Sequence, residues 1–176
     1  KNTEQIVIIG GSDAGISAGL RIRELEPSWP ITVILKDEFP NFSICGIPYA
    51  IGGEVQPWQN LAHRTLAELE KTGMHFIMNT SVTSIQPETH EITVSPNVGS
   101  QSTTLQYTKL MIGTGAVPNV PRIRGLSMNS ANIHVLHTMS DYFRIEAQVT
   151  QKSIQRVAIL GSGYIGIEMA EALAQR

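Results

Sequence analysis

The stretch IVIIGGSDAG, residues 6–15, decides the fold expected for this chain. Residues 5–9 form a mostly β-branched apolar run, which is typical of a strand buried on both faces. A glycine-rich turn follows, and we expect a helix over residues 14–25 that ends before Pro27. Residues 31–35 read as a second buried strand. This order of strand, glycine turn, helix and strand predicts an α/β fold with a Rossmann-like opening.

A second glycine-rich turn, GSGYIG at residues 161–166, lies about 150 residues further along. We expect a strand over residues 155–160 before it and a helix over 164–176 after it. Gly161 permits the tight turn, Gly163 lets the backbone approach a pyrophosphate, and Gly166 lets the helix pack on the strand. The alternative is a purely structural turn, but the strand–turn–helix setting favours a dinucleotide site at the helix N-terminus.

The first turn departs from this pattern at two positions. Ser12 replaces the middle glycine, and Leu35, followed by Lys36, stands where an acidic residue would hold a ribose hydroxyl. Taken alone, the turn is as compatible with a structural role as with nucleotide binding. Gly113-Thr114-Gly115 favours binding, because it ends an expected strand over residues 105–112 and lets backbone approach a flat cofactor.

The region between the two turns predicts a small β-meander inserted into the parallel sheet. Residues 61–71 have helical spacing, and short strands are expected over 75–78, 82–86 and 91–94. A later helix is expected over 140–151. We therefore predict a first nucleotide-binding domain over 1–120, a connector with a helix over 121–153, and the first βα unit of a second Rossmann-like domain over 154–176. A βα unit without a following strand lacks half of its crossover, so we expect a fragment of a longer protein.

Composition excludes several classes of function. The 176 residues carry a net charge of −2, with 41% hydrophobic and 16% charged residues, as in a globular protein. No basic run indicates nucleic-acid binding, and no apolar run is long enough to span a membrane. The histidines lack metal-ligand spacing, so no metal site is expected. One cysteine allows no intramolecular disulfide, which predicts a reducing, cytoplasmic location.

That cysteine is Cys45, within NFSICGIPY at residues 41–49. Gly46 and Pro48 suit the start of a helix, and a helix N-terminus lowers a thiol pKa from its usual value of about 8.5 and so favours the reactive thiolate. The alternative is an inert, buried cysteine. Position alone does not separate the two.

Four stretches together carry a family resemblance: residues 6–15, 42–53, 107–118 and 157–170. In their order and content the chain resembles the pyridine nucleotide-disulfide oxidoreductase family. Within it, the chain is similar to the single-cysteine branch of coenzyme A-disulfide reductases, NADH oxidases and NADH peroxidases. The resemblance covers almost the whole chain and favours Cys45 as the catalytic, redox-active residue.

The resemblance implies two cofactors, FAD at the first turn and NADH or NADPH at the second. The FAD contacts that it implies are Gly10, Gly11, Ser12, Gly15, Leu35, Lys36, Val82, Thr114 and Gly115. The NAD(P)H contacts that it implies are Gly161, Gly163, Tyr164, Ile165, Gly166 and Glu168. Tyr164 matches an aromatic that shields the flavin, and Glu168 matches an acid near the nicotinamide.

The resemblance also implies an activity. Hydride would pass from NAD(P)H to FAD, and electrons would pass to Cys45, which reduces coenzyme A disulfide or polysulfide. The alternatives are a peroxide- or oxygen-reducing enzyme that uses a cysteine sulfenate, and a flavin redox sensor without turnover. Coenzyme A or another acceptor would meet Ser17, Arg21 and Asn41, although arginines on this helix also suit a solvated face. The full-length protein is expected to be a homodimer, and the fragment alone is expected to be inactive.

Overall fold

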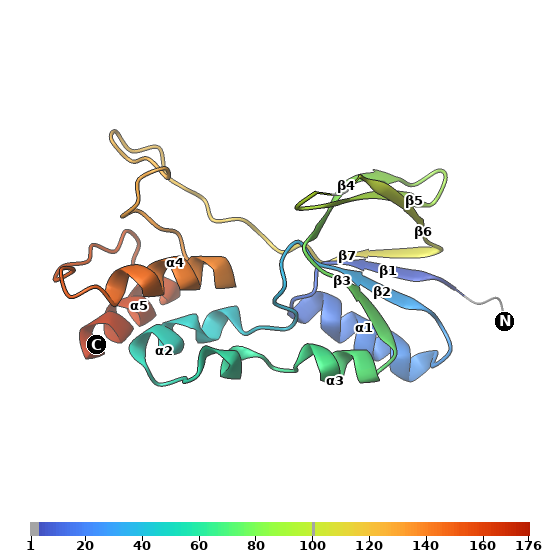
Figure 1. Ribbon diagram of the computed structural model, residues 1–176, viewed down its shortest axis with the longest axis horizontal. Helices are drawn as coiled ribbons and strands as arrows, with labels where there is room; N and C mark the ends of the chain where they lie inside the picture. The colour runs from blue at the N-terminus through green and yellow to red at the C-terminus, as the bar shows by residue number, and fades with distance from the viewer. Residues whose placement is uncertain (1–3, 100) are drawn as a thin grey trace. The chain divides into compact units, whose positions relative to one another are not determined.

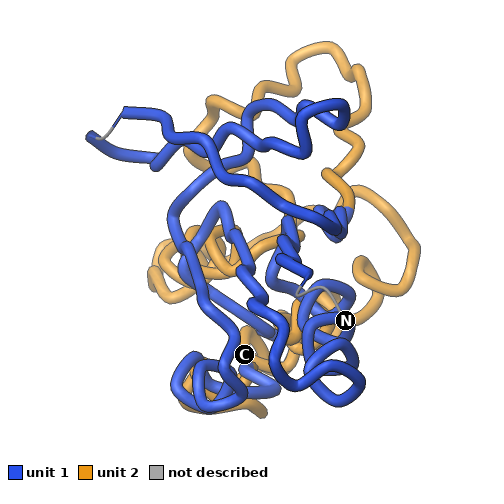
Figure 2. The backbone as a smooth tube through the Cα atoms, turned by 90° about the vertical axis from the view of Figure 1, so that its right-hand side faces the viewer, with its two compact units in different colours: residues 1–42, 62–115 blue, residues 43–61, 116–176 orange. Residues whose placement is uncertain are grey.

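The computed structural model describes residues 4–99 and 101–176, and these fall into two compact units (Figure 2). Unit 1 contains the chain up to Phe42 together with Ala62–Gly115. Unit 2 contains Ser43–Leu61 and Ala116–Arg176. The domain boundaries expected at residues 120 and 153 stay a prediction.

Unit 1 is built on a four-stranded parallel sheet in the order β3-β2-β1-β7. Its strands are β1 (Ile6–Ile9), β2 (Ile31–Ile34), β3 (Met74–Ile77) and β7 (Lys109–Ile112). In β1 and β2, seven of the eight residues are buried and all seven are apolar; the exception is the half-buried Thr32. The α/β fold with a parallel sheet is confirmed.

The two faces of this sheet are covered by different layers (Figure 1). On one face, Ile6, Ile8 and Val33 pack with Ile16 of α1 (Asp13–Leu25) and with Leu69 of α3 (Leu66–Lys71). The residues of opposite parity, such as Val7, pack against a three-stranded antiparallel meander. The meander consists of β4 (Thr80–Gln86), β5 (Glu91–Pro96) and β6 (Thr103–Gln106), so an inserted meander is present as expected. The strand expected over 75–78, however, is β3 of the parallel sheet and not part of the meander.

One expected strand is two strands in the structure. The prediction of a single strand over residues 105–112 is wrong, because β6 ends at Gln106 in the meander and β7 begins at Lys109 in the parallel sheet. Between them the Tyr107 N–H donates to the carbonyl of His90, and the Thr108 N–H donates to that of Gln5. The apolar pattern continues from one strand to the next because Leu105 of β6 and Leu110 of β7 both pack, partly buried, against the same cluster as Tyr107.

The helix expected over residues 61–71 is also shorter than predicted. The 3₁₀ turn η2 (Trp58–Leu61) ends at the first residue of this range, and α3 begins only at Leu66, so residues 62–65 are not helical. Thr65 caps α3: its hydroxyl accepts from the N–H of Glu68, and the Glu68 carboxylate accepts from the N–H of Thr65. A threonine with a glutamate three residues later is a capping box, and it sets the start of the helix.

Unit 2 is helical. It contains η1 (Ile44–Gly46), α2 (Ile47–Gly52), η2, α4 (Met139–Val149) and α5 (Tyr164–Gln175). Gly52 lies close to Ala172, since a Cβ on Gly52 would be 3.3 Å from the Ala172 Cα. The guanidinium of Arg176 donates to the carbonyl of Ile51 and pairs with Glu146. These contacts join α2, α4 and the end of α5.

The strand expected over residues 155–160 is not formed. Neither of the two sheets in the described part of the chain includes these residues, and all six are exposed. Val157 is 52% exposed and Leu160 is 71% exposed. A β-strand is stable only when a neighbouring strand takes up its backbone hydrogen bonds, and no described segment does so here. The helix expected after the turn is present as α5.

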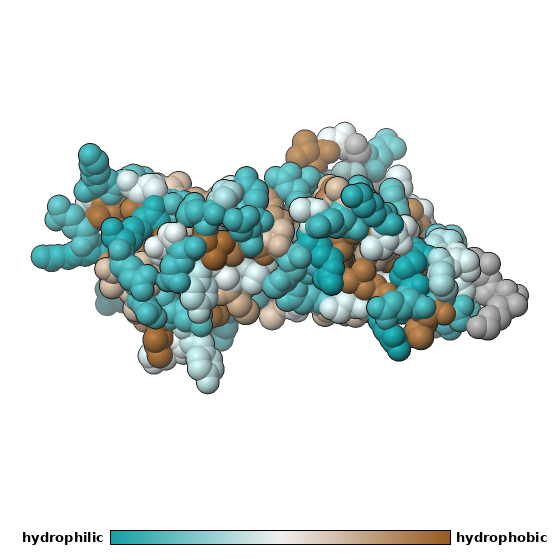
Figure 3. All heavy atoms as spheres, turned by 90° about the horizontal axis from the view of Figure 1, so that it is seen from below, coloured by the Kyte–Doolittle hydropathy of each residue, from teal (hydrophilic) through white to brown (hydrophobic). Residues whose placement is uncertain are grey.

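No described helix is long and apolar enough to cross a membrane. On the face of the molecule drawn in Figure 3, hydrophilic side chains predominate and apolar ones form small separate patches. Scattered apolar groups of this kind are normal on a protein surface.

Candidate functional site

The first glycine turn leaves no room for side chains at its two ends. Gly10 has a φ of +107°, and a Cβ there would lie 2.1 Å from the carbonyl oxygen of Gly113. A Cβ on Gly15 would lie 1.9 Å from the carbonyl oxygen of Gly10. Both positions therefore need glycine, for backbone conformation at Gly10 and for close approach at both.

The helix that follows this turn has no side-chain cap. Ser12 is its N-cap, but the Ser12 hydroxyl makes no capping hydrogen bond. Gly163, the N-cap of α5, has no side chain to offer one. The first N–H groups of both helices thus remain available, and together with the helix dipole they favour an anion such as a pyrophosphate.

The helices α3 and α4 have the opposite arrangement. Thr65 with Glu68, and Thr138 with Asp141, form complete capping boxes. The Thr65 N–H and hydroxyl bind the Glu68 carboxylate and lower its pKa. Burial alone would raise the pKa of Asp141, but hydrogen bonds from Thr138, Arg144 and His137 outweigh burial and lower it. These two N-termini are occupied by their own side chains.

The two departures in the first turn have structural explanations. Ser12 has a φ of −86°, which any residue adopts, and its side chain is exposed, so the turn does not need glycine here. Leu35 is 4% exposed, and its side chain fills the space beside Gly11, where a Cβ would lie 2.3 Å from the Leu35 Cδ2. The Leu35 side chain therefore belongs to the core and offers no hydrogen bond to a ribose.

Other predicted FAD contacts lie on unit 1 where backbone is accessible. The N–H of Gly113 donates to the carbonyl of Ile9, and the exposed Thr114 and Gly115 follow, Gly115 with a φ of +66°. Lys36 is exposed. Val82 lies on β4, which is an edge strand and so leaves part of its backbone outside the ladder.

Cys45 is exposed, which removes the alternative of an inert, buried core cysteine. It lies in the 3₁₀ turn η1, and Gly46 is the N-cap of α2 with Pro48 in the first turn, as expected for a helix start. The helix α2 has only six residues, so its dipole is a weaker argument for a thiolate than the sequence suggested.

The second turn repeats the conformation of the first. Gly161 has a φ of +123°, and a Cβ on Gly166 would lie 2.1 Å from the Gly161 carbonyl oxygen. Gly163, Tyr164 and Ile165 are exposed, Tyr164 by 88%. The expected turn–helix arrangement is thus present even though the strand before it is not.

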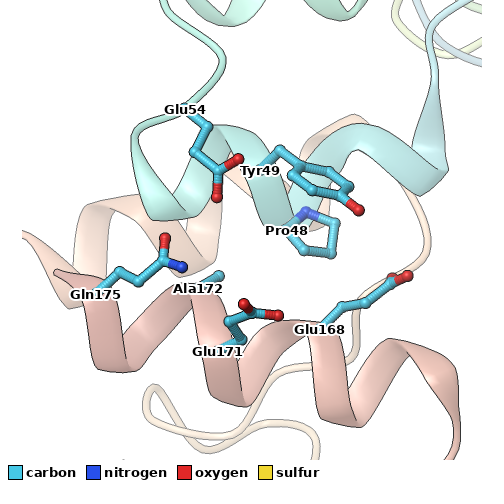
Figure 4. Close-up of a pocket in the computed structure, with 7 residues that line it drawn as sticks. All are labelled: Pro48, Tyr49, Glu54, Glu168, Glu171, Ala172 and Gln175. Atoms are coloured by element: carbon cyan, nitrogen blue, oxygen red, sulfur yellow. The ribbon is translucent and has the colours of Figure 1, made fainter.

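Glu168 faces a cavity of about 460 Å³ within unit 2 (Figure 4). Tyr49 and Pro48 of α2 line it, and it contains three carboxylates, those of Glu54, Glu168 and Glu171. No basic residue lines this cavity, so its charge opposes the binding of phosphate groups. No described group of histidine, cysteine and acidic side chains could hold a metal ion.

Comparison with known proteins decides the family. The model of the family described as "Pyridine nucleotide-disulphide oxidoreductase" matches residues 4–176. This chain belongs to that family.

Individual relatives in the family differ in what they reduce. A relative from Pyrococcus horikoshii, an NAD(P)H coenzyme A polysulfide/persulfide reductase, is 33% identical over 97% of this chain and 37% of its own length. The structure of a water-forming NADH oxidase from Lactobacillus brevis, bound to NADH, superposes with a TM-score of 0.90 at 29% identity, covering 98% of this chain and 38% of that one. An NAD-dependent persulfide reductase from A. fulgidus gives a TM-score of 0.88 at 29% identity, covering 97% and 32%. The chain spans less than half the length of each.

Two acceptor-side predictions for this family member lie on α1. Ser17 and Arg21 are both exposed and four residues apart, which places them on one face of the helix. Arg21 pairs with Glu24 at 2.7 Å, as a solvated surface arginine does. Arg23 instead donates to the carbonyls of Pro27, Trp29 and Gly73, so it holds the end of α1 in place.

The structure brings three polar side chains together that the sequence did not connect. The amide Nδ2 of Asn41 donates to the Asp13 carboxylate at 3.1 Å, and His63 Nε2 lies 3.8 Å from the same oxygen. Asn41 was predicted to meet the acceptor, whereas Asp13 and His63 were not singled out. No spacing rule links residues so far apart in the chain, so only the folded backbone brings them together.

Proposed function

We propose that this chain is the FAD-binding and first NAD(P)H-binding part of an oxidoreductase that reduces a sulfur acceptor through Cys45. The observation that carries the proposal is an exposed, solitary cysteine in a chain with two uncapped glycine-turn helices. In the proposed domain division, residues 1–120 serve FAD, 121–153 connect, and 154–176 begin the NAD(P)H domain.

The first turn would hold FAD. Its pyrophosphate fits the uncapped start of α1, and the crowded Gly10 and Gly15 allow backbone to reach it. Backbone at Val82 and at Gly115 would contact other parts of the cofactor, and Leu35 and Lys36 would lie beside the adenosine. When bound, FAD would accept hydride from NAD(P)H and supply two electrons for the sulfur chemistry.

The second turn would hold NADH or NADPH. Gly161, Gly163 and Gly166 keep the backbone free of side chains, and the first N–H groups of α5 would bind the pyrophosphate. The exposed Tyr164 would cover the flavin until nicotinamide enters, with Ile165 beside it. Glu168, which lines the acidic cavity, would lie near the nicotinamide and away from the pyrophosphate.

Cys45 would carry the reduction of the acceptor. Its thiolate would attack one sulfur of a disulfide, so that a bond from Cys45 to that sulfur forms, the original S–S bond breaks, and one thiolate leaves. Two electrons and one proton that originate from NAD(P)H would then cleave the new bond and restore the Cys45 thiolate with release of a second thiol. The relative from Pyrococcus horikoshii supports a coenzyme A-linked polysulfide or persulfide as acceptor.

Replacement of the sulfur tests this mechanism. In the full-length protein, Cys45→Ser should abolish NAD(P)H-dependent reduction of coenzyme A disulfide, because the hydroxyl is no redox nucleophile at neutral pH. Bound FAD per chain should stay at the wild-type level, which shows that the variant folds. Full disulfide reductase activity in Cys45→Ser would sink the mechanism.

A second candidate is reduction of oxygen or peroxide through a Cys45 sulfenate. The similarity to a water-forming NADH oxidase favours it. Mass spectrometry of the full-length protein purified without reductant separates the two, since coenzyme A on Cys45 indicates the reductase and a sulfenate indicates the oxidase. A flavin sensor would instead show reduction of FAD by NAD(P)H without sustained turnover. A homodimeric, cytoplasmic enzyme remains part of the proposal.

A further inference from the structure

Asn41 is held from three sides near the point where the chain leaves unit 1. Its N–H donates to the carbonyl of Gly11 at 2.8 Å, and its carbonyl accepts from the N–H of His63 at 2.9 Å. Its side-chain Nδ2 donates to the Asp13 carboxylate at 3.1 Å. All these partners belong to unit 1, so Asn41 fixes the exit of the chain from that unit.

The residue type at position 41 follows from the backbone. Asn41 has a φ of +57°, in the left-handed region that asparagine tolerates better than other residues with side chains. The side chain is also enclosed, since the residue is only 3% exposed. It therefore offers almost no surface to which an acceptor molecule could bind.

The side-chain amide of Asn41 has one unsatisfied atom. Its Oδ1 is buried without a hydrogen-bond partner, which is unfavourable. The reverse orientation of the amide would be worse, because it would place Oδ1 against the Asp13 carboxylate. The bond to Asp13 thus determines the orientation of the side chain.

We propose that Asn41, anchored by its hydrogen bond to Asp13, is a positioning residue for Cys45 rather than a contact of the acceptor. Cys45 follows four residues later, and four residues of chain span at most about 14 Å. Beyond Asn41, the Ser43 N–H donates to the Leu61 carbonyl and the Gly46 N–H donates to the Ser43 carbonyl, so the segment is held up to the turn that carries the thiol. The inference rests on the proposed redox role of Cys45.

The test uses Asn41→Gly, which keeps the left-handed backbone available and removes the amide. Asn79→Gly is the matched control, because Asn79 also has a left-handed φ, +52°, and an exposed side chain. In the full-length protein with saturating FAD, Asn41→Gly and Asp13→Ala should each lower kcat for coenzyme A disulfide about tenfold, as small misplacements of reacting groups do. KM for the disulfide should change less than about twofold.

The effects of Asn41→Gly and Asp13→Ala on kcat should not be additive, because both remove the same hydrogen bond. The double variant should lose about tenfold in kcat, rather than the roughly hundredfold that independent sites would give. A tenfold rise of KM with kcat unchanged would make Asn41 an acceptor contact and overturn the proposal, as would unchanged kcat and KM or a multiplicative loss in the double variant.

A measurement without turnover separates this inference from the proposed function. Alkylation of reduced protein by iodoacetamide is followed on the tryptic peptide that contains Cys45. Asn41→Gly should raise the rate about threefold by releasing the segment, whereas Asn79→Gly should not. An unchanged or lower rate refutes the positioning role even if Cys45 is catalytic. Retained activity in Cys45→Ser refutes the proposed function whatever the alkylation rate.

Discussion

The two glycine turns have nearly the same local geometry although their sequences differ. The first glycine of each has a positive φ, +107° at Gly10 and +123° at Gly161. A Cβ on the last glycine would lie 1.9 Å from the first carbonyl oxygen at Gly15 and 2.1 Å at Gly166. The conformation of such a turn is thus encoded within its own six residues.

Their surroundings differ. Gly10 follows β1, which is paired on both sides, and it lies against Gly113. Gly161 follows an unpaired, exposed segment, and a Cβ there would meet nothing within 4 Å. A glycine turn is therefore a local property, whereas the strand before it needs partners from distant sequence.

The largest expected effect on stability is that of replacing the first glycine of each turn, Gly10 or Gly161, with alanine. Gly10→Ala combines backbone strain of about 1–3 kcal/mol with a clash against Gly113 of about 1–3 kcal/mol. We expect it to lower the free energy of unfolding by about 4 kcal/mol and to abolish FAD binding, measured by urea denaturation and bound flavin. Gly161→Ala carries only the strain and should cost about 2 kcal/mol. Equal losses of unfolding free energy in the two variants would contradict the conclusion that only Gly10 packs against distant backbone.

Substitution of the last glycine in each turn should affect the binding of one cofactor without affecting the other. Gly166→Ala places a Cβ against the Gly161 carbonyl and should cost about 2 kcal/mol. Because this turn would serve only the nicotinamide cofactor, the full-length variant should keep its FAD but lose reduction of that FAD by NAD(P)H. Gly15→Ala is the matched variant at the other turn and should lose FAD itself. FAD loss in Gly166→Ala would show that the sites are not separate.

Sequence patterns predicted those parts of the fold that depend on neighbouring residues or on a continuous run of apolar residues. The strands β1 and β2 were predicted because burial on both faces leaves an apolar run that only Thr32 interrupts, and α1 because a glycine turn and Pro27 flank it. The strand over 155–160 was wrong because pairing is not a property of the segment itself. The strand over 105–112 was wrong because an apolar run does not show which of two sheets buries it.

The candidate site was predictable to a similar extent. The glycine positions follow from motif spacing. The position of Cys45 just before a helix follows from Gly46 and Pro48 beside it. The contact of Asn41 with Asp13 joins residues 28 apart, so only the folded backbone brings it about. The space that Leu35 fills beside Gly11 depends on the packing of β2 against the turn, which no local pattern indicates.

The capped helices sharpen the contrast with the uncapped ones. Thr138→Ala removes the cap of α4 and should lower the free energy of unfolding by about 1 kcal/mol without changing the affinity for either cofactor. Thr65→Ala at the exposed cap of α3 should cost less. Calorimetry and cofactor titration of both variants check this. Weakened cofactor binding in Thr138→Ala would give α4 a role beyond the fold.

The cap of α4 should also depend on pH. Hydrogen bonds lower the pKa of Asp141 in the folded state below its ordinary value near 3.9 despite burial. The stabilisation is therefore complete above about pH 5 and is lost as pH falls through the lower, folded-state pKa. Asp141→Asn should flatten this part of the stability–pH curve, measured by thermal melting. A wild-type slope in the variant would assign the acid sensitivity to other groups.

The smallest expected effect concerns Ser12, where the two turns differ in sequence. Ser12 has a negative φ, an exposed side chain and no capping bond, so neither strain nor a lost hydrogen bond follows from its removal. Ser12→Gly makes the first turn match the second and should cost only a few tenths of a kcal/mol. The Kd for FAD, measured by fluorescence titration, should change less than about threefold. A tenfold higher Kd would mean that the Ser12 hydroxyl itself binds the cofactor. The two turns would then differ in how they bind a cofactor as well as in the packing around them.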